Sequence, residues 1–287
     1  MSEFLVCPFT ETILSAISGR SVVFRVENIE DLRGIRPHAN EYSIHIHCIV
    51  FTTPTLTAFP LDTIDSDLPI ALHASCLGSF PSLLRMLPAL RHSNLRVYLP
   101  MTHADRFSEL RILSSLGIHT AGVFCSDTED WERVTDLMTY ALLGRAPHAP
   151  IFPFQYLATR YHPQTRRNWT AVYFDDPATY VHVDAEGHLA FQLEEMKREQ
   201  FLDLDFSRSG DLTQHPDFLV WQERWKSHFL QNDLCSRCPG WRACSGLFAS
   251  QCDDGGCRSF FSEFLDCVEQ YQARTYPSIG REEIWQP

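Results

Sequence analysis

Residues 95–143 decide the fold class and read LRVYLPMTHADRFSELRILSSLGIHTAGVFCSDTEDWERVTDLMTYALL. The stretch contains two short apolar runs, Leu95–Leu99 and Ala121–Phe124, each of a length typical of a buried strand. Each run is followed by a segment whose apolar residues recur at helical spacing, Arg106–Leu116 and Trp131–Leu143. Short strands that alternate with helices predict βαβ units and a parallel sheet, so we expect an α/β fold.

The same alternation extends toward both ends of this stretch. Upstream, Tyr42–Phe51 is rich in β-branched and aromatic residues, and Leu68–His73 is a second short apolar run. Downstream, Tyr180–Val183 and His188–Gln192 flank the turn Asp184–Gly187, a pattern typical of a β-hairpin. We therefore expect the sheet to begin near residue 41 and the hairpin to end it before residue 195.

Composition and charge argue against several classes of protein. The 287-residue chain carries 36 acidic and 24 basic residues, a formal net charge of −12. A nucleic-acid-binding protein needs a basic face to neutralise phosphates, so no nucleic-acid partner is expected. No apolar run approaches the length of about 18 residues that a membrane helix needs, so no membrane association is expected. The first residues lack a basic segment before an apolar one, so we expect no signal peptide and a cytoplasmic location.

Six of the ten cysteines lie in one segment of 33 residues in the last third of the sequence. Their spacing is C-x2-C-x5-C-x7-C-x4-C-x9-C, at positions Cys235, Cys238, Cys244, Cys252, Cys257 and Cys267. The other four cysteines are scattered and form no motif. Disulfides are disfavoured in the cytoplasm, where clustered cysteines more often bind a thiophilic metal. The segment is therefore a candidate metal centre.

Three kinds of chemistry compete for these thiols. A structural zinc site usually has two CxxC-like pairs, and the segment has one such pair, Cys235 and Cys238. An iron–sulfur cluster also takes four cysteine thiolates but accepts wider spacing and one distant ligand. Disulfides suit a small secreted chain, which this sequence does not resemble. We rank the iron–sulfur cluster first, zinc second and disulfides third.

The segment Cys235–Gly246, CSRCPGWRACSG, resembles the auxiliary-cluster (SPASM) domain of radical SAM peptide-modifying enzymes. That domain has the pattern C-x2-C-x5-C-x3-C followed, after a gap, by a last cysteine. The resemblance implies that one [4Fe–4S] cluster is held by a last cysteine together with Cys235, Cys238 and Cys244. Cys267 best fits the spacing of that last cysteine, and Cys252 and Cys257 remain alternatives.

Two departures from that family narrow what the resemblance implies. Phe248 stands where the fourth cysteine of the pattern would be, so the second auxiliary cluster of the family is expected to be absent. Radical SAM enzymes bind their catalytic cluster through C-x3-C-x2-C after the first barrel strand, and here Cys48 stands alone near the end of a predicted strand. The chain therefore resembles a degenerate, pseudo-radical-SAM member that cannot cleave S-adenosylmethionine by the family's route.

The resemblance also implies a domain organisation. The βα pattern of residues 42–143 and the hairpin that follows resemble the barrel of those enzymes and its exit. We therefore expect three parts: an N-terminal segment over 1–40, a partial (β/α) barrel over 41–195, and a SPASM-like cysteine-rich metal-cluster domain over 196–287.

Two histidines on one predicted strand offer a separate possibility. His45 and His47 alternate along Tyr42–Phe51 and so project to one face of the sheet, where two imidazoles could begin a mononuclear metal site. His73, at the end of the next predicted strand, would join them at the carboxyl-terminal rim, where barrel enzymes place their chemistry. The alternative interpretation is that these are hydrogen-bonded core histidines that fill a partial barrel, and we favour it.

These observations predict an accessory, non-SAM-cleaving iron–sulfur protein in the maturation of a ribosomally synthesised peptide. Its expected partners are the precursor peptide, a peptide-modifying enzyme subunit, or both, and an open sheet edge would offer such a partner unpaired backbone groups. Two alternatives stay open: an electron-transfer iron–sulfur protein, and a metalloenzyme that uses His45 and His47. No catalytic residue is assigned from the sequence.

Overall fold

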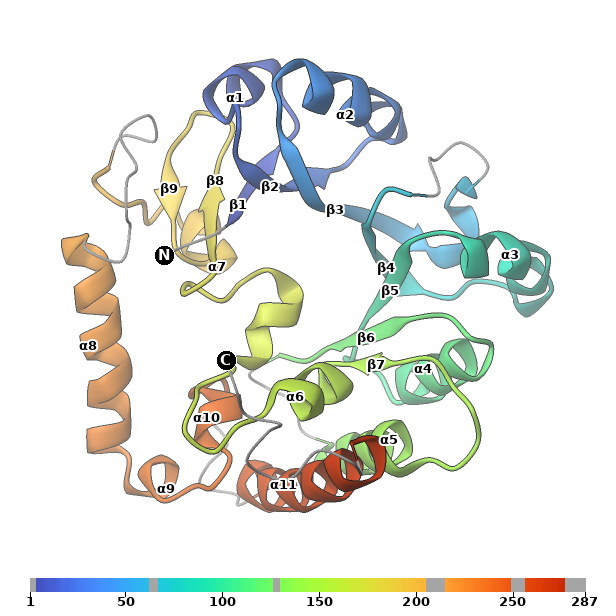
Figure 1. Ribbon diagram of the computed structural model, residues 1–287, viewed down its shortest axis with the longest axis vertical. Helices are drawn as coiled ribbons and strands as arrows, with labels where there is room; N and C mark the ends of the chain where they lie inside the picture. Colours follow the sequence, from blue (N-terminus) through green and yellow to red (C-terminus); the bar gives the residue numbers. More distant parts are fainter. Residues whose placement is uncertain (1–3, 62–66, 126–129, 205–214, 249–255, 277–287) are drawn as a thin grey trace. The chain divides into compact units, whose positions relative to one another are not determined.

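Figure 1 shows the computed structural model of the chain, which describes residues 4–61, 67–125, 130–204, 215–248 and 256–276. Within these residues the fold is α/β, with nine strands in one mostly parallel sheet and helices between them. The predicted α/β class is therefore confirmed. The chain divides into two compact units, the first made of Met1–Leu99 and Tyr173–Gln222, the second of Pro100–Val172 and Glu223–Pro287.

The first unit carries the larger part of the sheet. Its strands have the order β5-β4-β3-β2-β1-β8-β9, and its neighbours are parallel except for the antiparallel pair β8 and β9. In chain order its elements are β1 (Phe4–Pro8), α1 (Glu11–Ala16), β2 (Ser21–Val26), α2 (Ile29–Glu41), β3 (His45–Thr55), η1 (Leu56–Ala58), β4 (Ile70–Cys76), α3 (Phe80–His92), β5 (Leu95–Pro100), β8 (Tyr180–Val183), β9 (Leu189–Ala190) and α7 (Leu193–Lys197). Strands β1 to β5 lie in chain order, as those of a (β/α) barrel do, but these pairings do not by themselves establish a barrel.

The central strands of this sheet are buried on both faces. The register places four apolar side chains on the same face of neighbouring strands, those of Phe24, Ile49, Leu72 and Val97. Each of the four is 0 % exposed. Burying an apolar side chain of this size contributes roughly 1.5–3 kcal/mol, so this face belongs to the core of the first unit, as does the opposite face, where Val23 is also 0 % exposed.

The N-terminal residues contribute two further βα units to this sheet. The expected segment over 1–40 contains β1 and β2, which are parallel neighbours, and β2 in turn pairs with β3. The strands have five and six residues, too short for their periodicity to distinguish them from buried helix segments. The sheet therefore begins near residue 4 rather than near residue 41.

The second unit combines a parallel strand pair with helices. In chain order it contains α4 (Asp105–Ser115), β6 (Thr120–Val123), α5 (Trp131–Leu143), β7 (Ile151–Phe152), α6 (Phe154–Arg160), η3 (Trp169–Tyr173), α9 (Asp233–Ser236), α10 (Trp241–Cys244) and α11 (Gly256–Thr275). Strands β6 and β7 pair in parallel. Helix α8 (Pro216–Gln231) crosses the boundary between the two units. The cysteine segment thus shares a compact unit with residues 100–172 and is not shown as a domain of its own.

Aromatic side chains form the core of the second unit. Trp169 is 0 % exposed. Its indole meets five aromatic rings at centroid separations of 5.5 to 6.0 Å, those of Phe124, Phe154, Phe248, Phe260 and Phe261. Helix α11 packs against α5 and α6, and the Gln272 side chain donates to the Ala158 carbonyl at 2.8 Å. The C-terminal helix is therefore integral to this core.

The last strand of the sheet within each unit is short. Strands β7 and β9 have two residues each. The Ile151 N–H donates to the Gln155 side chain, and the Leu189 carbonyl accepts from the Leu202 N–H at 2.8 Å. These edges therefore offer an added strand less unpaired backbone than the sequence suggested. None of the described helices combines the length and the apolar character of a membrane span.

Candidate metal centre

Three of the predicted cysteine ligands lie on consecutive tight turns. Cys235 is in α9, where the Asn232 side-chain oxygen accepts its backbone N–H at 3.1 Å. The Cys238 N–H donates to the Cys235 carbonyl at 3.1 Å, and Cys244 closes α10. Cys235 is buried, whereas Cys238 and Cys244 are partly exposed. This cysteine loop (residues 235–244) therefore presents three thiols on a short piece of backbone that borders solvent.

Gly240, inside the cysteine loop, is the point at which the loop approaches helix α11 closely. A Cβ atom at Gly240 would come within 2.3 Å of the Phe261 Cβ, so the loop backbone lies directly against α11. Phe261 follows Cys257 by four residues, about one helical turn, and precedes Cys267 by six. The position of Phe261 therefore identifies the face of α11 on which the cysteine loop rests.

Helix α11 separates its two cysteines too widely for one cluster to bind both. Cys257 and Cys267 are ten residues apart in a continuous helix, or about 15 Å along its axis. They also differ in direction. At about 100° per residue, Cys257 lies about 40° around the helix from Phe261, and Cys267 lies about 120° from it. Cys257, which is buried, is therefore the α11 cysteine on the side of the cysteine loop.

Cys267 faces helix α5 instead. Its thiol is hydrogen-bonded to the Thr139 side chain, and burial raises the pKa of Cys267, as do the nearby carboxylates of Glu263 and Asp266. Metals bind the thiolate, so surroundings that keep a thiol protonated make it a poorer ligand. Cys252 lies outside the residues that the structure describes.

The arrangement of the described thiols bears on which metal would fit. A tetrahedral zinc site, with Zn–S bonds of about 2.3 Å, brings its thiolates to about 3.8 Å from one another. In the part of the chain that the structure describes, no three cysteine sulfurs lie within 4.8 Å of one another. A four-iron cluster carries each thiolate on a different iron and so spaces its ligands more widely.

The structure places His45 and His47 at the wrong end of the sheet for the predicted metal site. Strand β3 begins at His45, so both exposed histidines lie at its amino-terminal end. His73 pairs with Thr52, five residues beyond His47, or about 16 Å along the strand. The expectation that the three meet at the carboxyl-terminal rim is therefore wrong, and so is the placement of Cys48, the fourth residue of β3, at a strand end.

Ring stacking accounts for two of these histidines. The His47 ring stacks on Phe4 at 3.9 Å, and the His73 ring lies nearly parallel to Tyr98 at 4.6 Å. Among the described residues, no group of metal-ligating side chains includes either histidine. The ring contacts account for His47 and His73 without a metal, but His45 and His47 are exposed, so these two are not the core histidines that the sequence analysis favoured.

His73 and Tyr98 belong to a polar group on the sheet face opposite that of Leu72. Arg96 donates to the Tyr98 hydroxyl at 3.3 Å. Burial raises the pKa of the Cys48 thiol to about 12, although Arg96 opposes the shift, and burial lowers the pKa of His73 to about 4. Near neutral pH the thiol stays protonated and the imidazole neutral, so this group is not poised for acid–base or thiolate chemistry.

The sequence pattern gave no sign of a second polar network in the first unit. The Arg25 guanidinium donates to the Val183 carbonyl at 2.9 Å, and His182 Nε2 lies 3.0 Å from an Asp175 carboxylate oxygen. Arg25 and Val183 are 158 positions apart, so no local spacing could have joined them. These contacts hold the returning strand β8 beside β1 and β2.

One further trio of potential ligands lies at the turn between β8 and β9. Asp184, Glu186 and His188 bring ligand atoms within 4.8 Å of one another. The Asp184 carboxylate already accepts the backbone N–H groups of Glu186 and His188 and contacts the His188 ring at 2.8 Å. These bonds are those of the turn itself, so the trio needs no metal to explain it.

Comparison with known proteins adds no family assignment. No protein-family model matches the chain, and no curated protein matches it either.

Proposed function

We propose that the chain is an accessory iron–sulfur protein in the maturation of a ribosomally synthesised peptide. In this proposal one [4Fe–4S] cluster is bound by four thiolates, those of Cys235, Cys238, Cys244 and Cys257. The observation that carries it is the position of the cysteine loop on the Phe261 side of α11, the side that Cys257 shares. The role in peptide maturation rests on the resemblance of the loop to SPASM domains.

The loop residues are suited to hold such a group. The Asn232 side chain fixes the turn that carries Cys235, and the Arg242 carbonyl accepts the Arg167 N–H at 3.0 Å, which ties the loop to the segment before η3. Beneath the loop, Phe248 and Phe261 are 0 % and 1 % exposed and exclude water from one side. A cluster bound here would supply a one-electron carrier whose potential depends on this burial and hydrogen bonding.

The proposal excludes cleavage of S-adenosylmethionine by this chain alone. The sequence has no C-x3-C-x2-C motif. The thiols of Cys7 and Cys48 lie in separate strands, and burial raises the pKa of each to about 12. A partner would therefore supply the radical chemistry, while this chain binds the precursor peptide or the enzyme subunit. Because β7 and β9 are short, we base the partner on the family resemblance and not on strand addition.

Anaerobic purification with iron, sulfide and zinc counted per chain tests the cluster. We expect about four irons and four sulfides in the wild type and in Cys267→Ser, and loss of both in Cys257→Ser. The two variants are a matched pair, because both remove a buried thiol from the same helix. Retention of the cluster in Cys257→Ser with loss in Cys267→Ser would reverse the ligand assignment, and a preparation with only tightly bound zinc would reject the cluster.

Two measurements test the accessory role. Coexpression with the products of neighbouring genes should yield a stable complex with a precursor peptide or a peptide-modifying enzyme, and a chain that stays alone under anaerobic conditions contradicts the proposal. Incubation of the purified chain with S-adenosylmethionine and a reductant should give no 5′-deoxyadenosine, so its detection would contradict the non-catalytic assignment.

The partial exposure of Cys238 and Cys244 favours electron transfer as a second candidate function. A cluster bound by these residues would lie near the surface, within reach of another redox centre. Reversible reduction of the cluster that accelerates turnover by a partner enzyme would distinguish electron transfer from a purely binding role.

A further inference from the structure

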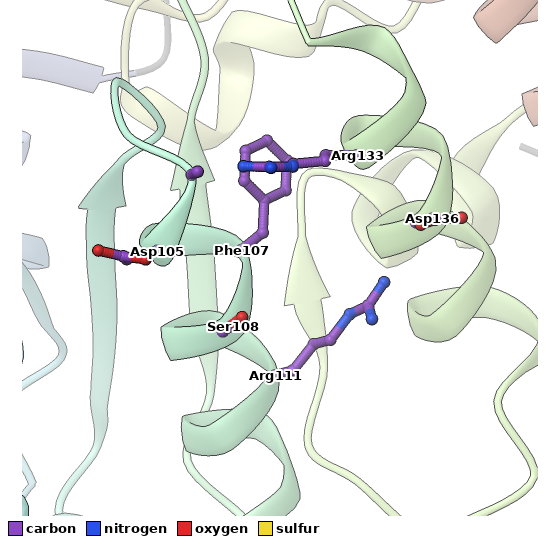
Figure 2. Close-up of a pocket in the computed structure, with 7 residues that line it drawn as sticks. Asp105, Phe107, Ser108, Arg111, Arg133 and Asp136 are labelled. Carbon is purple, nitrogen blue, oxygen red and sulfur yellow. The ribbon is translucent and has the colours of Figure 1, made fainter.

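Residues of α4 and α5 line an open polar pocket that the cysteine centre does not use. Its volume is about 340 Å³, near the lower end of the range of small-molecule sites. Figure 2 shows its lining, which includes Asp105, Phe107, Ser108, Arg111, Arg133 and Asp136. The pocket lies wholly within the second unit. Two of these six side chains carry guanidinium groups, so the ionic partners of these two arginines bear on which ligand the pocket could bind.

The two arginines enter the pocket from opposite helices. Arg111 extends from α4 toward α5, and Arg133 extends from α5 toward α4 (Figure 2). Arg133 Nε lies 3.1 Å from an Asp130 carboxylate oxygen, and this is its one ion pair among the described residues. Within the part of the chain that the structure describes, its two terminal nitrogens form no ion pair.

Arg111 is the less satisfied of the two arginines. Its guanidinium carbon stands 5.5 Å from the centre of the Tyr140 ring, and it forms no ion pair with any carboxylate in the described part of the chain. Its Nε atom is buried and has no hydrogen-bond acceptor among those residues. A buried donor without an acceptor costs free energy, which an acceptor brought by a ligand would recover.

The two aspartates of the pocket equal the two arginines in number but are not paired with them in the part of the chain that the structure describes. In Figure 2 the Asp105 side chain points away from both arginines. No ion pair joins Asp105 or Asp136 to Arg111 or Arg133 within the residues described. The N-cap residue of α4, Ala104, has no side chain that could cap the helix, and the carboxylate of Asp105 lies in its first turn.

We infer that this pocket binds a small ligand through an oxyanion, a phosphate or a carboxylate. Guanidinium groups are suited to both oxyanions, because their fixed pairs of N–H donors match two oxygens at once. The Ser108 hydroxyl lines the same space and can donate a further hydrogen bond. The aromatic face of Phe107 would contact the apolar part of the ligand. The site is independent of any metal bound by the cysteine loop.

Titration calorimetry at low ionic strength tests this site, with inorganic phosphate and succinate as separate probes. We expect saturable binding of at least one probe, weakened by added salt, and the stronger of the two identifies the oxyanion class. Arg111→Gln and Arg133→Gln should each weaken binding by about 10- to 100-fold, as expected for a lost charged hydrogen bond. Arg111→Lys keeps the charge but loses the paired donors, so its affinity should lie between those of the wild type and of Arg111→Gln.

Arg106→Gln is the matched control. Arg106 lies on α4 but forms an ion pair with Glu109 at 2.6 Å and does not line the pocket. Its substitution should change affinity by less than about twofold. Thermal melts of all variants check that each is folded. Absence of binding by both probes to about 10 mM, or equal affinity in the wild type and in Arg111→Gln, would overturn the inference.

Discussion

Substitution of Gly240 by alanine tests the packing on which the ligand assignment depends. The new methyl carbon would lie 2.3, 2.5 and 2.7 Å from the Cβ, Cγ and Cδ1 atoms of Phe261. Favourable carbon–carbon contacts are about 3.5–4.0 Å apart, so the overlap exceeds about 1 Å. The Phe261 Cβ is attached to the helix backbone, so no rotation of its side chain removes the contact. Either the cysteine loop or α11 must move.

The expected loss of unfolding free energy depends on how little space the surrounding side chains leave for that movement. Phe261 is 1 % exposed and packs against Trp169, Phe248 and Phe260. Overpacking of a dense core usually costs about 1–3 kcal/mol, and we expect Gly240→Ala to reach or exceed about 3 kcal/mol because the backbone must shift. Urea unfolding followed by tryptophan fluorescence measures this cost, since Trp131 and Trp169 both belong to the second unit. The iron content should fall in the same variant.

Gly34→Ala is the control with the opposite expected sign. Gly34 lies within α2, and a Cβ atom there would meet its neighbours at 3.6 Å or more, an ordinary contact distance. Alanine in a helix interior is favoured over glycine by about 0.5–1 kcal/mol, so this variant should be slightly stabilised. If Gly240→Ala lowers the unfolding free energy by less than about 1 kcal/mol and keeps its iron, the loop does not rest on α11 as described and the case for Cys257 fails.

Two further predictions concern titratable groups of the first unit. Burial lowers the pKa of His73 from 6.5 to about 4. Between these pH values the unfolded chain binds a proton at His73 that the folded chain does not bind. The free energy of unfolding should therefore fall by up to about 3 kcal/mol as the pH drops from 6.5 to 4. Urea midpoints at several pH values should show a smaller fall in His73→Phe, and an equal fall in both proteins would refute the effect. The thiols of Cys7 and Cys48, whose pKa values burial raises to about 12, should resist alkylation in the native protein while exposed Cys125 reacts. Mass spectrometry of partly labelled protein checks this, and rapid native labelling of Cys48 would contradict it.

The alternation in residues 95–143 was enough to predict the α/β class. The two strands and two helices expected there end within one residue of β5, α4, β6 and α5. Each of these elements has a period that matches its structure and a clear break on either side, so local sequence determined them. The shorter strands β1 and β2 lack that information, and the sequence analysis therefore missed them.

The alternative of a metal site at His45, His47 and His73 depended on where the strands begin and end. The run Tyr42–Phe51 suggested a strand that begins near residue 42, but α2 extends to Glu41 and Ser43 adopts a positive φ of 55° before β3 begins. The strand consequently starts three residues later and continues to Thr55. Which residues of parallel strands lie side by side depends on register, and the register is set by the whole sheet and not by either strand alone.

The cysteines illustrate the same limit at the candidate site. Spacing along the sequence made Cys267 the closest match to the family pattern. Spacing counts residues and contains no information on the side of the helix from which each side chain projects. A helix turns successive residues by about 100°, so residues at similar distances in sequence can face different neighbours. The contact of Gly240 with Phe261 supplies the missing direction, and no pattern of cysteines alone contains it.

The first turn of helix α5 contributes residues to two regions, the α4–α5 pocket and the aromatic core beneath the cysteine loop. Asp130 caps that turn and also holds Arg133 in place, while the neighbouring Trp131 ring packs on Phe248 and Phe260. Asp130 thus holds a side chain of the α4–α5 pocket and caps the helix whose first residue, Trp131, packs in the aromatic core of the second unit. A substitution of Asp130 is therefore expected to affect both the pocket and the packing of Trp131.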